Sequence, residues 1–274
     1  MDHYKSVHPL KYYQDYLIHD LRPDGRSISK FRNIAMNVDS ITTANGSAVV
    51  RVGNTCVVCG IKAELGPPRT EEPENGFLLI NVDLPSLCSS QFRPGPPSDK
   101  AQVLTAFVNN IALQCGIIEL KSLCIQADKL VWTLYCDIIC INYDGAVADA
   151  CFTSLIGALL SVSLPKVEYN NETNVISVNE ETKISLNVLC KPIATSFAIF
   201  NEKTILVDPC EEEELLSSGM FCIVISDNEL CSIHKPGGNV LEEEQIKKCI
   251  SKAKERTVLI YELIQATTFK QKLL

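Results

Sequence analysis

Apolar and polar positions in the first half of the chain follow two periods. Short runs that alternate or are rich in β-branched residues predict strands, because successive strand side chains point to opposite faces. These runs are residues 34–42, 47–52, 55–62, 77–84 and 129–142. Gly53-Asn54 between two of them is typical of a tight hairpin turn. Apolar residues three and four positions apart predict helices over 99–116 and 147–160.

The second half continues with strands and closes on one long helical stretch. The strands are expected at residues 183–189, 195–200, 203–207, 219–226 and 229–234. A helix is expected from about Val240, because apolar side chains recur there at helical spacing. The members of this stripe are Ile246, Cys249, Ile250, Ala253, Thr257, Ile260 and Ile264.

The two halves resemble each other in the order of their elements. In each, a hairpin is followed by an acidic loop with proline, a strand that begins at glycine, and a helix; the hairpins are residues 49–61 and 197–208. This order predicts an α+β chain. We expect a helical N-terminal arm over residues 1–21 and a single domain of two β-rich halves over residues 22–274.

The charge balance limits the classes of function. Among 274 residues, 33 are acidic and 25 are basic, which leaves a formal charge of −8 and a pI near 5.1. A protein that holds nucleic acid alone through a broad basic face usually has a pI above about 9. The composition therefore favours a local basic groove, or a subunit that shares its ligand with partners.

Thirteen cysteines lie mostly inside apolar runs. The first residues show no apolar stretch behind a basic start, so we expect reduced thiols in a protein of the cytosol or nucleus. Cys56 and Cys59 have the spacing of a redox or zinc motif, but on a strand they point to opposite faces. No metal site and no cofactor is therefore expected.

Two further patterns have a chemical and a structural interpretation. The basic stretch 234–238 (His-Lys-Pro-Gly-Gly) suits a loop near phosphate or a strand-to-helix turn, and we favour the turn. The glutamates 211–214 behind Asp208 suit a divalent cation or a solvated, mutually repelling turn, which we favour again. Glycine patterns for dinucleotides, P-loops or a serine nucleophile are absent from the sequence.

Several segments together resemble the RNase PH family of phosphorolytic exoribonucleases. Residues 22–26 (Arg-Pro-Asp-Gly-Arg), 45–48 and 52–55 resemble the N-terminal part of the sequences of this family. Further segments resemble one branch of this family, which forms the non-catalytic ring subunits of the RNA exosome. These segments are residues 62–68, 81–85, 94–97, 130–132, 143–145 and 207–214. Segments 83–93 and 234–238 are most similar to one eukaryotic type of ring subunit. The resemblance covers roughly residues 9–260.

The resemblance implies the RNase PH fold, which duplicates βαβα halves and is like ribosomal protein S5 domain 2. It also implies a ring of three heterodimers around a central RNA channel that serves 3′-to-5′ rRNA maturation and mRNA turnover. The expected partners are the subunit of the ribosomal-RNA-processing forty-six type, S1/KH cap proteins and RNA, with no membrane. The expected locations are cytoplasm, nucleus and nucleolus. Apolar runs at 77–84 and 130–141 suggest surfaces that neighbours complete.

The resemblance further implies a degenerate phosphate site. Active relatives hold phosphate with Gly-Ser/Thr-Arg at a helix N-terminus, where this chain has Gly145-Ala146-Val147. The hydroxyl and the guanidinium are therefore missing, and Asp149 is close in sequence. Two unit charges ~6 Å apart interact by about 3 kcal/mol at an effective dielectric near 20, so we expect Asp149 to repel phosphate.

Metal and RNA positions of the family are also replaced. Active relatives have two metal-binding aspartates where this chain has Glu214 and Met220, and a thioether cannot replace a hard oxygen ligand of Mg²⁺. They have two RNA-gripping arginines where it has Asn110 and Leu113. The resemblance thus implies that the chain has no catalytic residues.

Loop cations remain as candidates for RNA contact, and each could equally be a solvated charge. They are Arg69, Arg93, Lys100, His234 and Lys235. Three functions stay open at this point. We favour a catalytically silent ring subunit over a free-standing RNA-binding regulator and over an active phosphorolytic exoribonuclease that uses Asp208 and the glutamates.

Overall fold

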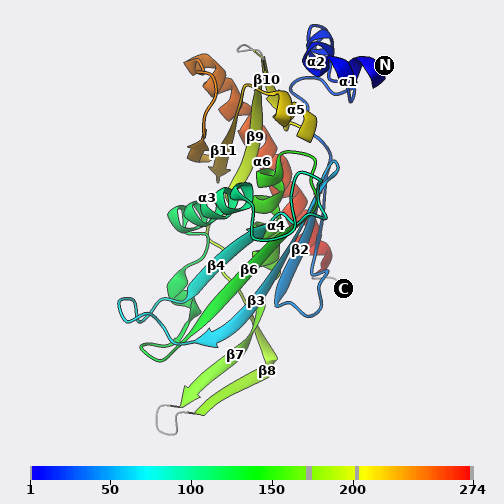
Figure 1. The fold of residues 1–274 in the computed structure, drawn as a ribbon. Helices are drawn as coiled ribbons and strands as arrows, with labels where there is room; N and C mark the ends of the chain where they lie inside the picture. The colour runs from blue at the N-terminus through cyan, green and yellow to red at the C-terminus, as the bar shows by residue number, and fades with distance from the viewer. Residues whose placement is uncertain (1, 171–174, 201–203, 272–274) are drawn as a thin grey trace.

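Two sheets share one central helix in the computed structural model, which describes residues 2–170, 175–200 and 204–271 (Figure 1). In the first sheet, β4 runs parallel to its neighbour β6 and the other pairs are antiparallel. Its strands in spatial order are β1 (Ile34–Val38), β2 (Gly46–Val52), β3 (Thr55–Gly66), β6 (Leu130–Asn142) and β4 (Phe77–Asp83), with β5 (Cys124–Gln126) beside the start of β6.

Local signals explain where these elements turn. Gly53 has a φ of 58° in the β2–β3 turn, as expected for this hairpin. The strand β1 is shorter than predicted, because Asp39 adopts a φ of 57° directly after Val38. The helix α3 (Asp99–Cys115) begins at the Ser98 cap, whose hydroxyl accepts the Ala101 N–H, and ends at left-handed Gly116. A short 3₁₀ turn, η1 (Leu120–Leu123), follows it.

The second sheet is covered on both faces. Its strands in spatial order are β10 (Thr204–Val207), β9 (Ile193–Phe200), β11 (Gly219–Ser226) and β12 (Glu229–His234), all antiparallel. Every residue of β9 is buried, since α4 (Val147–Ser161) and α6 (Glu243–Gln271) both pack on this strand. The predicted stripe of α6 is buried at Cys249, Ala253, Thr257, Ile260 and Ile264.

The two sheets differ in order although their elements repeat. In the first, β6 lies between β3 and β4; in the second, β11 pairs directly with β9. The α4 helix packs against β2 and β3 of the first sheet as well as β9 of the second. This position explains why α4 is buried around almost its whole circumference rather than on one stripe.

The sequence prediction missed a two-stranded ribbon. Instead of one strand at 183–189, the chain forms β7 (Ser163–Asn170) and β8 (Val175–Ser185), an antiparallel pair that extends away from the two sheets in Figure 1. Its apolar side chains Val175, Ile176 and Val178 are exposed. Adjacent apolar residues in β8 break the in–out alternation that identifies strands in a sequence, whereas β7 keeps this alternation over residues 166–170.

The N-terminal residues form two short helices, α1 (Asp2–Val7) and α2 (Pro9–Leu17), beside α5 (Glu211–Leu216) (Figure 1). Tyr13 is 2% exposed and packs against Phe200 of the second sheet. Lys5 and Tyr13 both donate to the Glu212 carboxylate, at 2.6 and 2.5 Å. The arm is thus tied to the second half. In the described part of the chain, every helix is too short or too polar to cross a bilayer.

Candidate functional site

The turn between β6 and α4 has two consecutive residues in the left-handed region and one backbone N–H that binds a carboxylate. Gly145 (φ 72°) and Ala146 (φ 47°) are both left-handed and precede the first turn of α4. A Cβ at position 145 would lie 2.6 Å from the Cys210 carbonyl carbon, so the turn requires glycine. Turns of this kind at a helix N-terminus favour an anion. We call this turn the cradle; it is the place where the resemblance puts the phosphate site of active relatives.

A carboxylate of the chain itself occupies the cradle. Glu214 accepts a 2.7 Å hydrogen bond from the Ala146 N–H through Oε1. Its other oxygen accepts from the Tyr143 hydroxyl and, at 3.3 Å, from Lys100 Nζ, which also contacts the Tyr143 oxygen. The Glu214 side chain is 7% exposed. Burial and the Glu214 charge raise the pKa of Tyr143, which keeps its hydroxyl protonated as a donor.

A mostly apolar pocket of about 220 Å³ adjoins the cradle. Its floor includes Phe107 and Phe221, and the His234 ring stacks on Phe107 with centroids 4.6 Å apart. Residues far apart in sequence meet here. The residues singled out in the sequence that line this pocket are Lys100, Ala146, Val147, Glu214, Met220 and His234. Its apolar walls offer an anion few hydrogen-bond donors.

Two positions of the degenerate site lie elsewhere. Asn110 and Leu113 are exposed on α3, with Leu113 at 62%, and neither lines the pocket. Their exposure is compatible with a surface contact, but the structure does not join them to the cradle.

The expectation for Asp149 is wrong in one respect. Its carboxylate is 1% exposed and points to β9, where it accepts the Ser196 N–H at 3.1 Å and the Ser196 hydroxyl at 2.6 Å. Burial, with a smaller contribution from Asp208, raises the pKa of Asp149 to about 7. Asp149 therefore does not face the cradle as a full charge, and the carboxylate that meets the cradle is that of Glu214.

Asp208 is bound by arginine and is not open to a metal. It is fully buried and accepts from Arg32 three times: from Nη2 at 2.7 Å, from Nε at 3.1 Å and from the backbone N–H at 2.7 Å. Burial alone would raise its pKa, but these bonds and the Arg32 charge lower it. Among the described residues, no group of three His, Cys, Asp or Glu side chains could hold a metal ion.

Sequence reasoning assigned no role to Arg32, which lies in a polar stretch without periodic signal. In the structure, Arg32 also donates to the Asp144 carbonyl at 2.6 Å and thereby contacts the segment before the cradle. Tyr143 was part of a motif behind the resemblance, yet no function followed from it. The hydrogen bond from its hydroxyl to Glu214 depends on long-range packing that sequence spacing does not report.

The glutamate run is not the solvated turn that we expected. Its four carboxylates have separate partners, because successive side chains of α5 point in different directions. Glu211 accepts from Ser89 and Gln91, Glu212 from the arm, Glu213 from Arg22, and Glu214 from the cradle. The run therefore connects distant parts of the chain.

The loop cations are not one cluster. Arg69 is exposed and lies over the Phe77 ring, just beyond the end of β3 that pairs with Val131; Lys100 lies at the cradle, beyond the opposite end of the sheet. Arg93 is exposed, and Lys235 Nζ donates to the Gly237 and Gly238 carbonyls. Lys100 and His234 both line the cradle pocket.

All thirteen cysteines are free thiols. Cys59 is fully buried and Cys56 half-buried, as expected for opposite faces of β3. Burial raises the pKa of Cys59, Cys136, Cys151 and Cys222, so these thiols stay protonated. They fill the core and carry no nucleophile.

Comparison with known proteins bears on this site. Two sequence models of the 3′ exoribonuclease family match: RNase PH domain 1 over residues 30–165 and domain 2 over residues 190–256. Exosome complex component rrp43 of Schizosaccharomyces pombe is 39% identical over 261 residues, covering 92% of this chain and 94% of that protein. Rrp42 of Methanothermobacter thermautotrophicus is 32% identical, covering 89% of each.

Solved structures agree with these relatives. The Archaeoglobus fulgidus exosome with RNA bound to the active site matches with a TM-score of 0.78 at 27% identity, over 89% of this chain and 92% of that one. An archaeal exosome core matches with a TM-score of 0.74 at 25% identity, over 89% and 90%. Rice Rrp46, at 14% identity and a TM-score of 0.68 over 90% and 100%, shares the fold. These matches confirm the predicted α+β architecture and the resemblance to the RNase PH family. The eukaryotic ring subunit that segments 83–93 and 234–238 resemble is of the ribosomal-RNA-processing forty-three type.

Proposed function

Because the chain belongs to the RNase PH family of 3′ exoribonucleases, we propose that it is a non-catalytic structural subunit of the six-membered RNA exosome ring. It helps to form the channel that guides RNA for 3′-to-5′ processing and degradation, in rRNA maturation and mRNA turnover. Relatives that cover about nine-tenths of its length are named as exosome components, which supports this proposal.

The main support for a lack of catalytic activity is the Glu214 carboxylate in the cradle. Phosphorolysis needs inorganic phosphate at this point, and Glu214 already accepts the Ala146 N–H there. A like charge about 4 Å away costs about 4 kcal/mol at an effective dielectric near 20. The engagement of Asp208 by Arg32, and a methionine at position 220, argue against a metal that could offset this repulsion.

An uncovered sheet face supports assembly with other ring subunits. Leu79, Tyr135, Ile139 and Ile141 are 39–45% exposed on the face of the first sheet that points away from the core, and Leu79 pairs with Tyr135 in register. Neighbouring subunits would cover such a face. We place the heterodimer partner in the ribosomal-RNA-processing forty-six type, with S1/KH cap subunits above the ring.

The proposal extends to RNA contact and location. Lys100 and His234 at the cradle pocket, together with Lys235, Arg69 and Arg93, are the proposed contacts to RNA in the channel. Residues 22–274 would act as one RNase PH-like unit, with residues 1–21 as an arm. The protein would work in cytoplasm, nucleus and nucleolus, as expected for a subunit of a eukaryotic exosome.

Two measurements test the proposal. The purified chain, in phosphate and Mg²⁺, should release no nucleoside diphosphates from RNA, and co-expression with candidate ring subunits should yield a particle of ring size. Release that Asp208→Asn abolishes would instead establish an active exoribonuclease. A stable monomer that ignores the other subunits while binding RNA would favour a free-standing regulator.

A further inference from the structure

A groove of about 550 Å³ lies beside the β2–β3 turn and shares no lining residue with the cradle pocket. One wall is the extended segment 30–35, and the other is formed by Arg51, Gly53 and Asn54 at the turn. The Gly53 N–H donates to the Asn33 carbonyl at 2.9 Å and so joins the two walls. We call this site the hairpin groove.

The hairpin groove gathers positive charge in a chain whose formal charge is −8. Its lining contains one carboxylate, Asp24, and four basic side chains, which are Arg26, Lys30, Arg32 and Arg51. Arg26 binds Asp24, and Arg32 binds Asp208, so these two guanidiniums are neutralised. Lys30 and Arg51 remain as the uncompensated charges of the groove.

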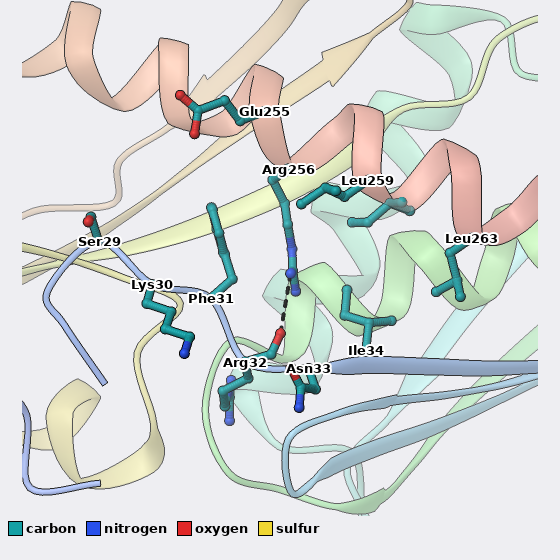
Figure 2. Close-up of a pocket in the computed structure, with 11 residues that line it drawn as sticks. Ser29, Lys30, Phe31, Arg32, Asn33, Ile34, Glu255, Arg256, Leu259 and Leu263 are labelled. Atoms are coloured by element: carbon teal, nitrogen blue, oxygen red, sulfur yellow. Dashed lines mark hydrogen bonds between the residues drawn. The ribbon is translucent and has the colours of Figure 1, made fainter. Parts of the chain in front are cut away.

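Both of these charges are open to a ligand from outside. Lys30 and Arg51 are exposed, and across residues 2–170, 175–200 and 204–271 neither forms an ion pair. Arg51 donates from Nε to the Gly53 carbonyl at 2.9 Å, which holds its side chain beside the turn and leaves both Nη groups for a ligand. Figure 2 shows the Lys30 and Asn33 side chains directed away from α6, whereas Phe31 points toward this helix.

Two exposed amides complete the set of donors. Asn33 and Asn54 line the groove, and their side chains form no hydrogen bond in the part of the chain that the structure describes. Each amide carries an NH₂ group that can donate. Ammonium, guanidinium and amide groups are the side-chain donors that bind sugar–phosphate backbones. The hairpin groove therefore fits phosphodiester oxygens.

A protein partner fits the hairpin groove less well. The core of a protein interface is apolar and rich in aromatic side chains. In the described chain, the large apolar side chains that are exposed lie outside this groove. Its own Phe31 lies under Arg256, and Ile34 packs against the core. A groove that offers charge and donors without an apolar anchor favours a phosphate backbone over a protein segment.

We propose that the hairpin groove binds the phosphodiester backbone of a single RNA strand. Lys30 and Arg51 pair with phosphates, and Asn33 and Asn54 donate to their oxygens. The choice of RNA among phosphate-bearing ligands rests on the proposed function. The loop cations named above as RNA contacts do not line this groove, so it is a separate site. It gives this acidic chain a basic surface of its own.

The salt dependence of RNA binding by the purified chain tests the proposal, with a short fluorescent oligouridylate as the probe. The double variant Lys30→Met with Arg51→Met removes both charges and keeps the alkyl stems. Affinity should fall at least about tenfold at low salt, and the slope of log affinity against log salt should become shallower by about 1.4, since each phosphate contact to a single strand contributes about 0.7.

The double variant Lys62→Met with Lys247→Met is the matched control. It removes the same net charge at two lysines that are each 70% exposed and lie outside the groove. Its affinity should stay within about twofold of the unmodified chain, because a delocalised field is screened by salt. An equal loss in both double variants would mean that RNA responds to net charge alone and would overturn the proposal.

Photocrosslinking locates the strand directly. RNA that carries 4-thiouridine should crosslink to peptides that contain residues 30–35 or 51–54, and crosslinks confined to other segments would overturn the proposal. A glutamate-rich peptide that displaces the RNA as well as unlabelled RNA does would assign the groove to an acidic protein segment and also overturn it.

Ring assembly, measured separately by co-expression, distinguishes this proposal from the proposed function. A ring whose RNA affinity is the same with Lys30→Met and Arg51→Met as with the unmodified chain overturns the groove assignment alone. A chain that binds RNA through the groove but enters no ring keeps the groove assignment and contradicts the ring function.

Discussion

The two ends of the segment from Asp208 to Glu214 lie in opposite electrostatic surroundings. Asp208 is fully buried, accepts from three N–H groups of Arg32 and has a lowered pKa. Glu214 has one half-exposed lysine, one tyrosine hydroxyl and one backbone N–H. The first end is saturated by arginine, and the second is bound mainly by neutral donors at the cradle.

The difference teaches how one short acidic stretch serves two purposes. At Asp208 it joins the segment before β1 to the second half, because Arg32 binds the Asp208 carboxylate. At Glu214 it accepts the Ala146 N–H of the cradle. A carboxylate is structural at one end and, as we propose, inhibitory at the other. The following variants probe each side of this comparison.

The largest effect is expected from Arg32→Met. It leaves the Asp208 carboxylate buried without its main partner, which should lower the free energy of unfolding by about 4 kcal/mol. Arg51→Met, at an exposed arginine of β2, should change it by less than about 0.5 kcal/mol. Urea denaturation measures both. A loss below about 1 kcal/mol for Arg32→Met would show that Asp208 is not locked by this arginine.

Gly145→Ala should destabilise the cradle next most. The new methyl group would meet the backbone of residues 209–211, and alanine is strained at a φ of 72°. We expect a loss of about 3 kcal/mol. Gly116→Ala is the control for strain alone, because its φ is 59° and a Cβ there meets nothing within 4 Å; about 1 kcal/mol is expected. Equal losses in thermal denaturation would contradict the close approach at the cradle.

The pH dependence separates Asp149 from Asp208. The pKa of Asp149 in the folded state is about 7, above its ordinary value of 3.8. Between these two pH values the folded state keeps a proton that the unfolded state has released. Its contribution to the free energy of unfolding is therefore lost as the pH rises toward 7 and then levels off. Asp208, with a lowered pKa, contributes no slope there.

Asp149→Asn removes this titration while keeping an oxygen for the Ser196 donors. Its stability relative to the unmodified chain should rise by about 2 kcal/mol between pH 5 and pH 8. Denaturant titrations at several pH values measure this difference. A difference that is flat with pH would mean that Asp149 is ionised throughout.

The smallest effect is expected from Lys100→Met. The lysine is 47% exposed, so water screens its pair with Glu214, and the free energy of unfolding should fall by less than about 1 kcal/mol. Lys121→Met, at a 66% exposed lysine, is the control and should have no measurable effect. A loss above about 2 kcal/mol would mean that the Glu214 end depends on its cation as strongly as the Asp208 end.

Regular elements with one buried face were predictable, and those without one were not. The Gly53-Asn54 hairpin, α3 and the α6 stripe follow from local periodicity and turn chemistry. In the β7–β8 ribbon, residues 166–170 of β7 alternate, but β8 exposes the adjacent apolar side chains of Val175 and Ile176, so only half of the ribbon carries a strand signal. The burial of α4 on nearly all sides also exceeds its expected stripe, because two sheets pack on it.

At the site, the sequence by itself determined which groups are missing: Ala146 and Val147 bring neither a hydroxyl nor a guanidinium, and Met220 brings no carboxylate. Only the tertiary structure decided where the remaining carboxylates point. Asp149 turns to Ser196, Asp208 to Arg32 and Glu214 to the cradle. The physical reason is that a buried charge is tolerated only beside donors, and the donors for each come from segments distant in sequence.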